Sequence, residues 1–191
     1  MSNLPRLIGL LGLAGSGKST VAQALEIGGY HRQRFAHPLK AMTATFLLTA
    51  GLDEADVVAR IDGDKKLDDI PGLGVSCRHL MQTLGTEWGR VCVRSDLWLH
   101  LARTGVERAW ANGQRVVIDD VRFANEAEAI REMGGILIRV NRPGVVAGGH
   151  VSETEQAGIE VDYELANDGA IADLVHRVAA ILSLHGQAQA A

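Results

Sequence analysis

A glycine-rich segment near the start of the chain has the residue types and the spacing that hold a nucleotide phosphate. Residues 12–19 read Gly-Leu-Ala-Gly-Ser-Gly-Lys-Ser and fit the pattern G-x-x-x-x-G-K-[ST] at every defined position. Glycines in such a segment let successive backbone N–H groups turn towards one phosphate at the N-terminus of a helix. Lys18 would then reach the β- and γ-phosphates, and the Ser19 hydroxyl would ligate Mg²⁺. The residues predicted to contact ATP in this segment are Gly12, Ala14, Gly15, Ser16, Gly17, Lys18, Ser19 and Thr20.

Two adjacent carboxylates follow a second apolar run and could complete such a site. The run Val-Val-Ile occupies residues 116–118, and Asp119 and Asp120 come directly after it. Successive side chains of a strand point to opposite faces, so only one of the two aspartates can face the phosphates directly. We expect Asp119 to ligate the metal and Asp120 to act on the substrates, although the alternation alone does not decide which of them faces the metal.

The segments around these motifs alternate between strand-like and helix-like patterns. Strands are expected at residues 7–11, 31–35, 115–119, 136–140 and 163–166. Helices are expected at residues 18–26, 39–50, 54–60, 78–88, 97–112, 125–133 and 171–184. Strands that alternate with helices in this way predict an α/β fold, a doubly wound five-stranded parallel sheet of the P-loop type.

Length, composition and charge limit the class of protein. The chain has 191 residues, of which 47% are hydrophobic and 22% are charged, so a disordered chain is excluded. A net charge of −4 favours neither a nucleic acid polymer nor an anionic membrane as partner. The longest apolar stretch, residues 7–15, is about half as long as a membrane span, and it lacks the flanks of a signal peptide. Cys77 and Cys92 lack metal-ligand spacing, and we therefore expect a cytoplasmic protein.

The arrangement of the motifs narrows the kind of nucleotide-binding protein. A GTPase switch carries an N-K-x-D pattern that this sequence lacks, and a motor ATPase needs a longer chain. A helical insertion after the first strands and an arginine-bearing Pro/Gly-rich loop near the end favour a nucleoside monophosphate kinase. We expect a single kinase domain over residues 1–191, in which residues 36–98 bind the acceptor and residues 142–158 form a lid.

Four further stretches carry motifs that are specific enough to compare with a known family. They are residues 35–40 (Phe-Ala-His-Pro-Leu-Lys), 78–90 (R-x-x-x-Q-x-x-G-T-E-x-x-R), 120–126 (D-x-R-x-x-N-E) and 150–153 (His-Val-Ser-Glu). Together with the P-loop, these stretches resemble the phage deoxynucleoside monophosphate kinases over most of the chain. The resemblance implies ATP- and Mg²⁺-dependent phosphorylation of deoxynucleoside 5′-monophosphates to diphosphates, in the host cytoplasm if the chain is phage-encoded.

The acceptor in such a reaction is itself a phosphate, so arginines matter more than a general base. Its second pKa is about 6, and the acceptor is therefore mostly dianionic at neutral pH before any base acts. Mg²⁺, Lys18 and several guanidinium groups must instead bring two polyanions together. The residues expected to act in catalysis are Lys18, Asp120, Arg122 and Arg142. The residues expected to bind the acceptor are Lys40, Arg78, Gln82, Glu87, Arg90, Trp98, Asp120 and Arg122.

Some of these assignments have an alternative. Asn167 is expected to hold the adenine edge of ATP, but it could equally belong to a plain turn. Trp98 could stack on a base or pack in the core, and Lys40 could simply be solvated. For the whole chain, the alternatives are a kinase for another small metabolite, such as dephospho-coenzyme A, and a non-catalytic ATP-binding protein. The partners are expected to be small nucleotides, and a homodimer is one open oligomeric state.

Overall fold

The computed structural model describes residues 4–145 and 156–188 and divides the chain into two units. The first, called here the sheet unit, comprises Met1–Arg34 and Ala102–Ala191. The second, the helical unit, comprises Phe35–Leu101.

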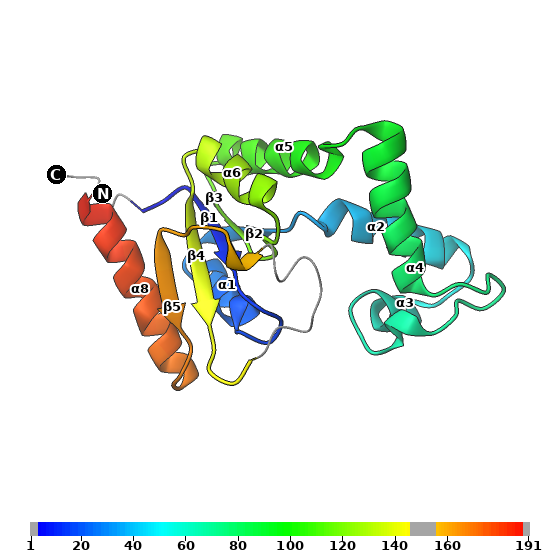
Figure 1. Cartoon of the computed structure of the whole chain (residues 1–191), viewed down its shortest axis with the longest axis horizontal. Helices are drawn as coiled ribbons and strands as arrows, with labels where there is room; N and C mark the ends of the chain where they lie inside the picture. Colours follow the sequence, from blue (N-terminus) through cyan, green and yellow to red (C-terminus); the bar gives the residue numbers. More distant parts are fainter. Residues whose placement is uncertain (1–3, 146–155, 189–191) are drawn as a thin grey trace. The chain divides into compact units, whose positions relative to one another are not determined.

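The sheet unit is built on five parallel strands (Figure 1). They are β1 (Leu7–Leu11), β2 (Tyr30–Gln33), β3 (Arg115–Ile118), β4 (Ile136–Asn141) and β5 (Tyr163–Ala166). Their order across the sheet is β2-β3-β1-β4-β5, and every neighbouring pair is parallel. The expected fold class, an α/β protein with a five-stranded parallel sheet, is therefore confirmed.

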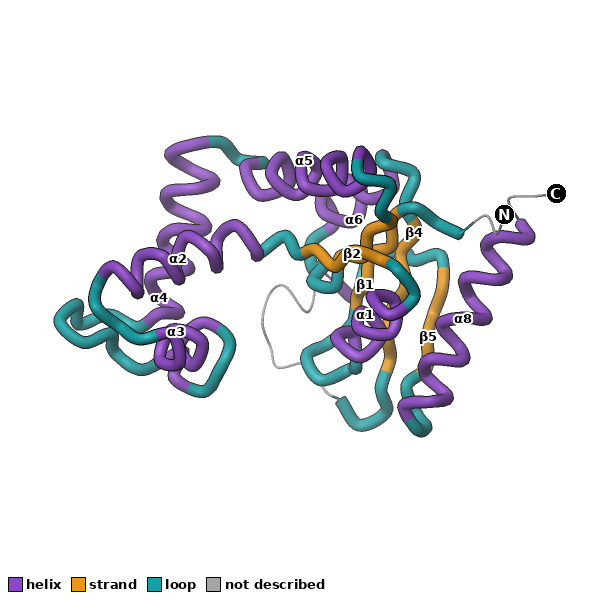
Figure 2. Tube along the Cα trace, turned by 180° about the vertical axis from the view of Figure 1, so that it is seen from behind, coloured by secondary structure: helices purple, strands orange, loops and turns teal. Residues whose placement is uncertain are grey.

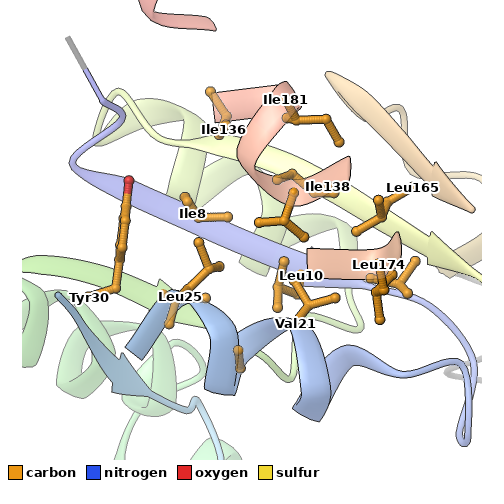
Figure 3. Packing of buried hydrophobic residues seen from close by; sticks show 14 residues of the cluster. Ile8, Leu10, Val21, Leu25, Tyr30, Ile136, Ile138, Leu165, Leu174 and Ile181 are labelled. Carbon is orange, nitrogen blue, oxygen red and sulfur yellow. The ribbon is translucent and has the colours of Figure 1, made fainter. Parts of the chain in front are cut away.

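Helices cover both faces of this sheet because the side chains of β1 alternate between them. Ile8 and Leu10 join residues of α1 (Lys18–Ile27) and α8 (Ile171–Ala188) in one buried apolar cluster (Figure 3). Gly9 faces the other way, where α6 (Ala124–Glu132) packs so closely that a Cβ would lie 2.6 Å from Ile130 Cδ1. The glycine thus allows α6 to approach the central strand.

The same cluster includes a buried tyrosine at the start of β2. The Tyr30 hydroxyl donates a hydrogen bond to the Pro5 carbonyl oxygen at 2.8 Å. Burial raises the pKa of Tyr30 to about 12, and the nearby charge of Arg115 only partly opposes this. Tyr30 therefore stays protonated and ties the segment before β1 to the edge strand.

Since all strands run in one direction, their carboxyl ends meet along one edge of the sheet, where ligands bind in such folds. Gly12 follows β1, Asp119 follows β3, Arg142 follows β4 and Asn167 follows β5. The residue that follows β2 is Arg34. The sheet thus brings together four of the predicted site residues and one residue that the sequence analysis did not consider.

The helical unit consists of helices joined mostly by short loops, and its longest loop spans residues 68–76 (Figure 2). They are α2 (His37–Thr49), α3 (Glu54–Ile61), η1 (Lys65–Leu67), α4 (Cys77–Gln82), η2 (Thr83–Val93) and the first turn of α5 (Leu97–Ala111). Its small core is made of Leu47, Val57, Ile61, Ile70 and Cys77. The side chains of Asp53 and Ser76 cap the N-termini of α3 and α4, respectively.

One segment of this unit differs from the helix expected over residues 78–88. The α-helix ends at Gln82 and continues as a π-helix, η2. Gly85 and Gly89 are buried there, and a Cβ on Gly89 would lie 2.6 Å from the Trp98 ring. The wide turn and the two small residues leave room for the Trp98 indole, a tertiary contact that helical periodicity does not reveal. Among the described residues, no helix combines the length and the apolarity needed to span a membrane.

Candidate active site

The glycine-rich segment adopts the backbone conformation that its sequence predicts. Gly12, Gly15 and Gly17 have φ angles of 136°, 79° and 105°, in the region that side chains rarely occupy. A Cβ on Gly12 would overlap the Val140 carbonyl oxygen, and one on Gly17 would overlap the Asn167 amide. Ala14 and Gly15 are exposed at the tip of the loop. These positions form a turn between β1 and α1 that has no space for larger residues at its base.

Lys18 lies across this loop. Its ammonium nitrogen, Nζ, donates to the Gly12 and Leu13 carbonyl oxygens at 2.5 and 2.8 Å. These bonds hold a positive charge over the turn whose N–H groups begin α1. Ser19 follows with an exposed side chain, and Thr20 is half-buried.

Two observations show that this loop suits an anion. The N-terminus of α1 has Gly17 at its cap position, and no side chain caps it. The Ser16 side chain is only 2% exposed, and its Oγ has no hydrogen-bond partner among the described residues. A buried hydroxyl without a partner is costly. A phosphate bound in the loop would offer acceptors to both the hydroxyl and the first N–H groups of the helix.

Asn167 contacts the loop from the side of β5. Its side-chain Nδ2 donates to the Ser16 carbonyl oxygen at 2.8 Å, and its own backbone N–H donates to Asn141 at 2.7 Å. The sequence suggests that Asn167 either holds the adenine edge of ATP or belongs to a plain turn. Neither interpretation includes this contact with Ser16. The residue braces the loop that would hold the phosphates.

Asp119 lies at the end of β3 and is engaged by two arginines from the neighbouring strand. Arg32 Nε donates to Asp119 Oδ2 at 3.0 Å, and Arg34 Nε donates to Oδ1 at 2.8 Å. Burial alone would raise the pKa of Asp119, but the hydrogen bonds from Arg34 and Arg32 outweigh it and hold the pKa below its usual value. The carboxylate is therefore charged, and both of its oxygens are occupied by guanidinium groups.

Asp120 and Arg122 lie beyond the same strand, on a short loop before α6. Asp120 is half-buried and Arg122 is exposed. The buried Glu126 carboxylate accepts from the backbone N–H groups of Arg122 and Phe123 at 2.8 and 3.2 Å. Glu126 thus fixes the loop that presents the Arg122 side chain.

Arg142 is exposed directly after β4. The expected lid, residues 142–158, lies largely outside the described residues, as does the His150–Glu153 motif.

The predicted acceptor residues all belong to the helical unit, apart from Asp120 and Arg122. Arg78 and Gln82 are exposed on α4, and Glu87 and Arg90 are exposed on η2. Lys40, at the start of α2, forms an ion pair with Asp62.

Trp98 also belongs to this group of predicted acceptor residues, but it is buried. It is 8% exposed, and its indole Nε1 donates to the Gly85 carbonyl oxygen at 2.8 Å. This placement favours core packing over base stacking for Trp98.

The sequence analysis missed Arg32 and Arg34. The signal was present, because two arginines two residues apart must share one face of a strand. The expected second strand was, however, only weakly marked by its polar residues, and nothing in the sequence pairs them with Asp119.

The family model described as deoxynucleotide monophosphate kinase matches residues 69–178. A protein of Acanthamoeba polyphaga mimivirus named as such a kinase is 34% identical over 185 residues, covering 90% of this chain and 93% of that protein. The deoxynucleoside-5′-monophosphate kinase of Escherichia phage T5 is 30% identical over 112 residues, covering 54% of this chain and 44% of that protein.

Among solved structures, TT1252 from Thermus thermophilus matches with a TM-score of 0.50 at 18% identity. The match covers 95% of this chain and 98% of that one, and it supports the fold alone. The family model covers more than half of the chain, and the mimivirus relative covers nearly all of it. The chain therefore belongs to the deoxynucleotide monophosphate kinase family.

Proposed function

We propose that this enzyme transfers the γ-phosphoryl group of ATP to deoxynucleoside 5′-monophosphates and releases ADP and the diphosphate. Kinase activity and nucleotide substrates follow from the family. The observation that carries the structural side of the proposal is the loop of residues 12–19, with Lys18 held over it and a buried, unpartnered Ser16 hydroxyl. The triphosphate of ATP would occupy this loop, and Lys18 would stabilise the charge that develops between the β- and γ-phosphates.

Mg²⁺ belongs to this proposal, and the donors present fit it. The Ser19 hydroxyl is exposed at the start of α1. One hydroxyl at this position suits Mg²⁺, which keeps several waters and binds through one or two protein oxygens and the substrate phosphates. When bound, it would neutralise charge on the β- and γ-phosphates, and Asp119 is the second protein ligand that the sequence predicts for it.

The chain's own residues have to position the acceptor rather than activate it. An oxygen of the acceptor phosphate attacks the γ-phosphorus and forms a new P–O bond. The bond between the γ-phosphorus and the β–γ bridging oxygen breaks, and its electron pair stays on that oxygen, which leaves as part of ADP. No proton has to be removed from a dianionic acceptor, so no general base is assigned. Arg78, with Gln82 one turn away on α4, is proposed to bind the acceptor, and Arg122 and Arg142 to stabilise the transferring group.

The same proposal assigns residues 36–98 to acceptor binding and residues 142–158 to a lid. Action in the cytoplasm of a host cell and a homodimeric state remain predictions.

A substrate panel tests the function. ADP release is measured with ATP and Mg²⁺ in the presence of each deoxynucleoside and ribonucleoside monophosphate, of dephospho-coenzyme A, and of no acceptor. We expect release to depend on a deoxynucleoside monophosphate. Turnover with dephospho-coenzyme A alone would support the alternative metabolite kinase, and ATP binding without turnover on any acceptor would support a non-catalytic protein.

A single variant then tests where the base is recognised. Gln82→Ala removes an amide that could read a base edge, and loss of a polar partner weakens discrimination between bases. We expect the ranking of the monophosphates to change while the KM for ATP does not. An unchanged ranking would place base recognition elsewhere.

A further inference from the structure

The carboxyl end of β2 carries two arginines that lie on one face of the sheet. Arg32 pairs in register with Val117 of β3, and Arg34 is two residues further along. Asp119 is likewise two residues beyond Val117, so the three charged side chains share a face. That face is the one that α1 covers, because Val117 packs in the same buried cluster as Leu10 and the residues of α1.

Arg32 and Arg34, called here the arginine pair, both make charge-assisted hydrogen bonds to Asp119. Arg32 donates hydrogen bonds from both Nε and Nη2 to Asp119 Oδ2. Arg34 donates from Nε to Oδ1 at 2.8 Å and from Nη2 to Oδ2 at 3.2 Å. The Asp119 side chain is 3% exposed, against 21% for Arg32 and 34% for Arg34. A buried carboxylate thus orients two guanidinium groups, of which Arg34 is the more accessible.

Arg32 has a further partner on α1. Its Nη1 lies 3.5 Å from a carboxylate oxygen of Glu26, whose side chain is 42% exposed. Arg32 is therefore held between Asp119 and the helix that begins at the P-loop. The Arg34 side chain is the more exposed of the two, and on that ground its guanidinium is the better placed to meet a ligand.

The position of the pair relative to the P-loop suggests which ligand group it would bind. In the order β2-β3-β1, the end of β2 lies two strand spacings from the end of β1, about 10 Å away. The opposite side of the P-loop is occupied by Asn167 at the end of β5. A second phosphate bound beside the one in the P-loop on the side of β3 and β2 would meet the arginines at the ends of these strands.

We propose that Arg34 binds the phosphate of the acceptor monophosphate, with Arg32 and Asp119 as positioning residues that hold its guanidinium. This inference rests on the proposed function, and it names residues of the acceptor site that the sequence motifs do not contain. It also gives Asp119 a different role from metal ligation, because both oxygens of its carboxylate bind arginine.

Three variants test this proposal by two measurements. Binding of each deoxynucleoside monophosphate to the protein without ATP or Mg²⁺ is measured by titration calorimetry. Steady-state rates then give the KM for the monophosphate and the Mg²⁺ concentration for half-maximal rate. Arg34→Gln should weaken monophosphate binding 10- to 100-fold, as expected for one lost charge-assisted contact. Arg34→Lys, which keeps the charge without the planar fork, should fall between this variant and the wild type.

Asp119→Asn separates the two roles of the carboxylate. We expect a several-fold higher KM for the monophosphate and an unchanged Mg²⁺ requirement. A raised Mg²⁺ requirement with unchanged monophosphate binding would identify Asp119 as a metal ligand and overturn the proposal. Unchanged monophosphate binding in Arg34→Gln would also overturn it.

The matched control is Arg103→Gln, since Arg103 is an exposed arginine of the sheet unit that pairs with Glu132. Thermal unfolding of every variant shows whether the fold is kept, and Arg34→Lys is the variant least expected to disturb it. The proposed function fails if the wild type transfers phosphate to no deoxynucleoside monophosphate. The present inference fails if the wild type does so and Arg34→Gln binds the acceptor as well as the wild type.

Discussion

The P-loop and the arginine pair lie at strand ends of the same sheet, but they are built in opposite ways. The P-loop is a run of eight consecutive residues, and backbone groups shaped by glycines form its cradle. The arginine pair consists of side chains that come together across 85 or 87 positions of sequence and depend on one buried carboxylate. A cradle made of backbone is sensitive to any added atom, whereas a cluster of side chains is sensitive to the loss of one charge. Substitutions should therefore affect the two regions differently.

The largest effect is expected at the charged residue of the P-loop. Lys18→Ala should lower kcat by about 100- to 1,000-fold, because the ammonium stabilises charge that develops in the transition state. ADP release with a saturating deoxynucleoside monophosphate measures this loss, and circular dichroism checks the fold. Turnover near that of the wild type would remove Lys18 from the mechanism.

Two glycines of the loop form a matched pair that tests the sensitivity of the backbone cradle. Gly12→Ala places a Cβ on the Val140 carbonyl, whereas Gly15→Ala meets no atom within 4 Å. Both have positive φ, so both should lose about 1–2 kcal/mol of stability through strain. Gly12→Ala should lose more, and its ATP binding should also weaken.

Urea unfolding and ATP titration of the two glycine variants measure these differences. Equal losses of stability in the two variants would mean that backbone strain, and not the overlap with Val140, limits this loop.

A smaller effect is expected for the residue that braces the P-loop. Asn167→Ala removes the hydrogen bond to the Ser16 carbonyl. One such bond contributes roughly 0.5–1.5 kcal/mol, so the KM for the donor nucleotide should rise about two- to tenfold. If Asn167 only braces the loop, the KM values for ATP and GTP rise together, whereas a loss specific to ATP would support the adenine edge. Steady-state rates with each donor distinguish the two.

The smallest effect is expected for an arginine outside both regions. Arg103 and Glu132 form an exposed ion pair on the sheet unit, and such pairs contribute at most about 1 kcal/mol. Arg103→Gln should leave kcat and both KM values unchanged and shift the unfolding midpoint only slightly. A loss of activity as large as that of Arg34→Gln would indicate that both variants act through the net charge of the sheet unit, and not through a specific contact of Arg34.

The same contrast explains how much could be predicted from the sequence. The strands Leu7–Leu11 and Tyr163–Ala166 lie at the predicted positions, and the sheet has the predicted parallel form, because alternating apolar segments carry local information. The P-loop motif is likewise local, and its glycines adopt the conformation that the motif requires.

Features that depend on distant partners could not be predicted in this way. The salt bridges of Arg32 and Arg34 with Asp119 require the β2–β3 pairing, which no local pattern specifies. The π-helix at Thr83–Val93 depends on the fit of the Trp98 indole, and the contact between Asn167 and Ser16 joins residues 151 positions apart. These features follow from tertiary packing, which overrides local preference.

Asn167 also makes the P-loop depend on strand register. Its backbone N–H binds Asn141 at the end of β4, while its side chain binds Ser16. A slip of β5 by one residue would turn the asparagine to the other face of the sheet and bring Ala166 or Asp168 to its position. Neither side chain can donate the hydrogen bond that Ser16 accepts. A change in the length of the segment between β4 and β5 therefore leaves the nucleotide site intact only if β5 keeps its pairing with β4.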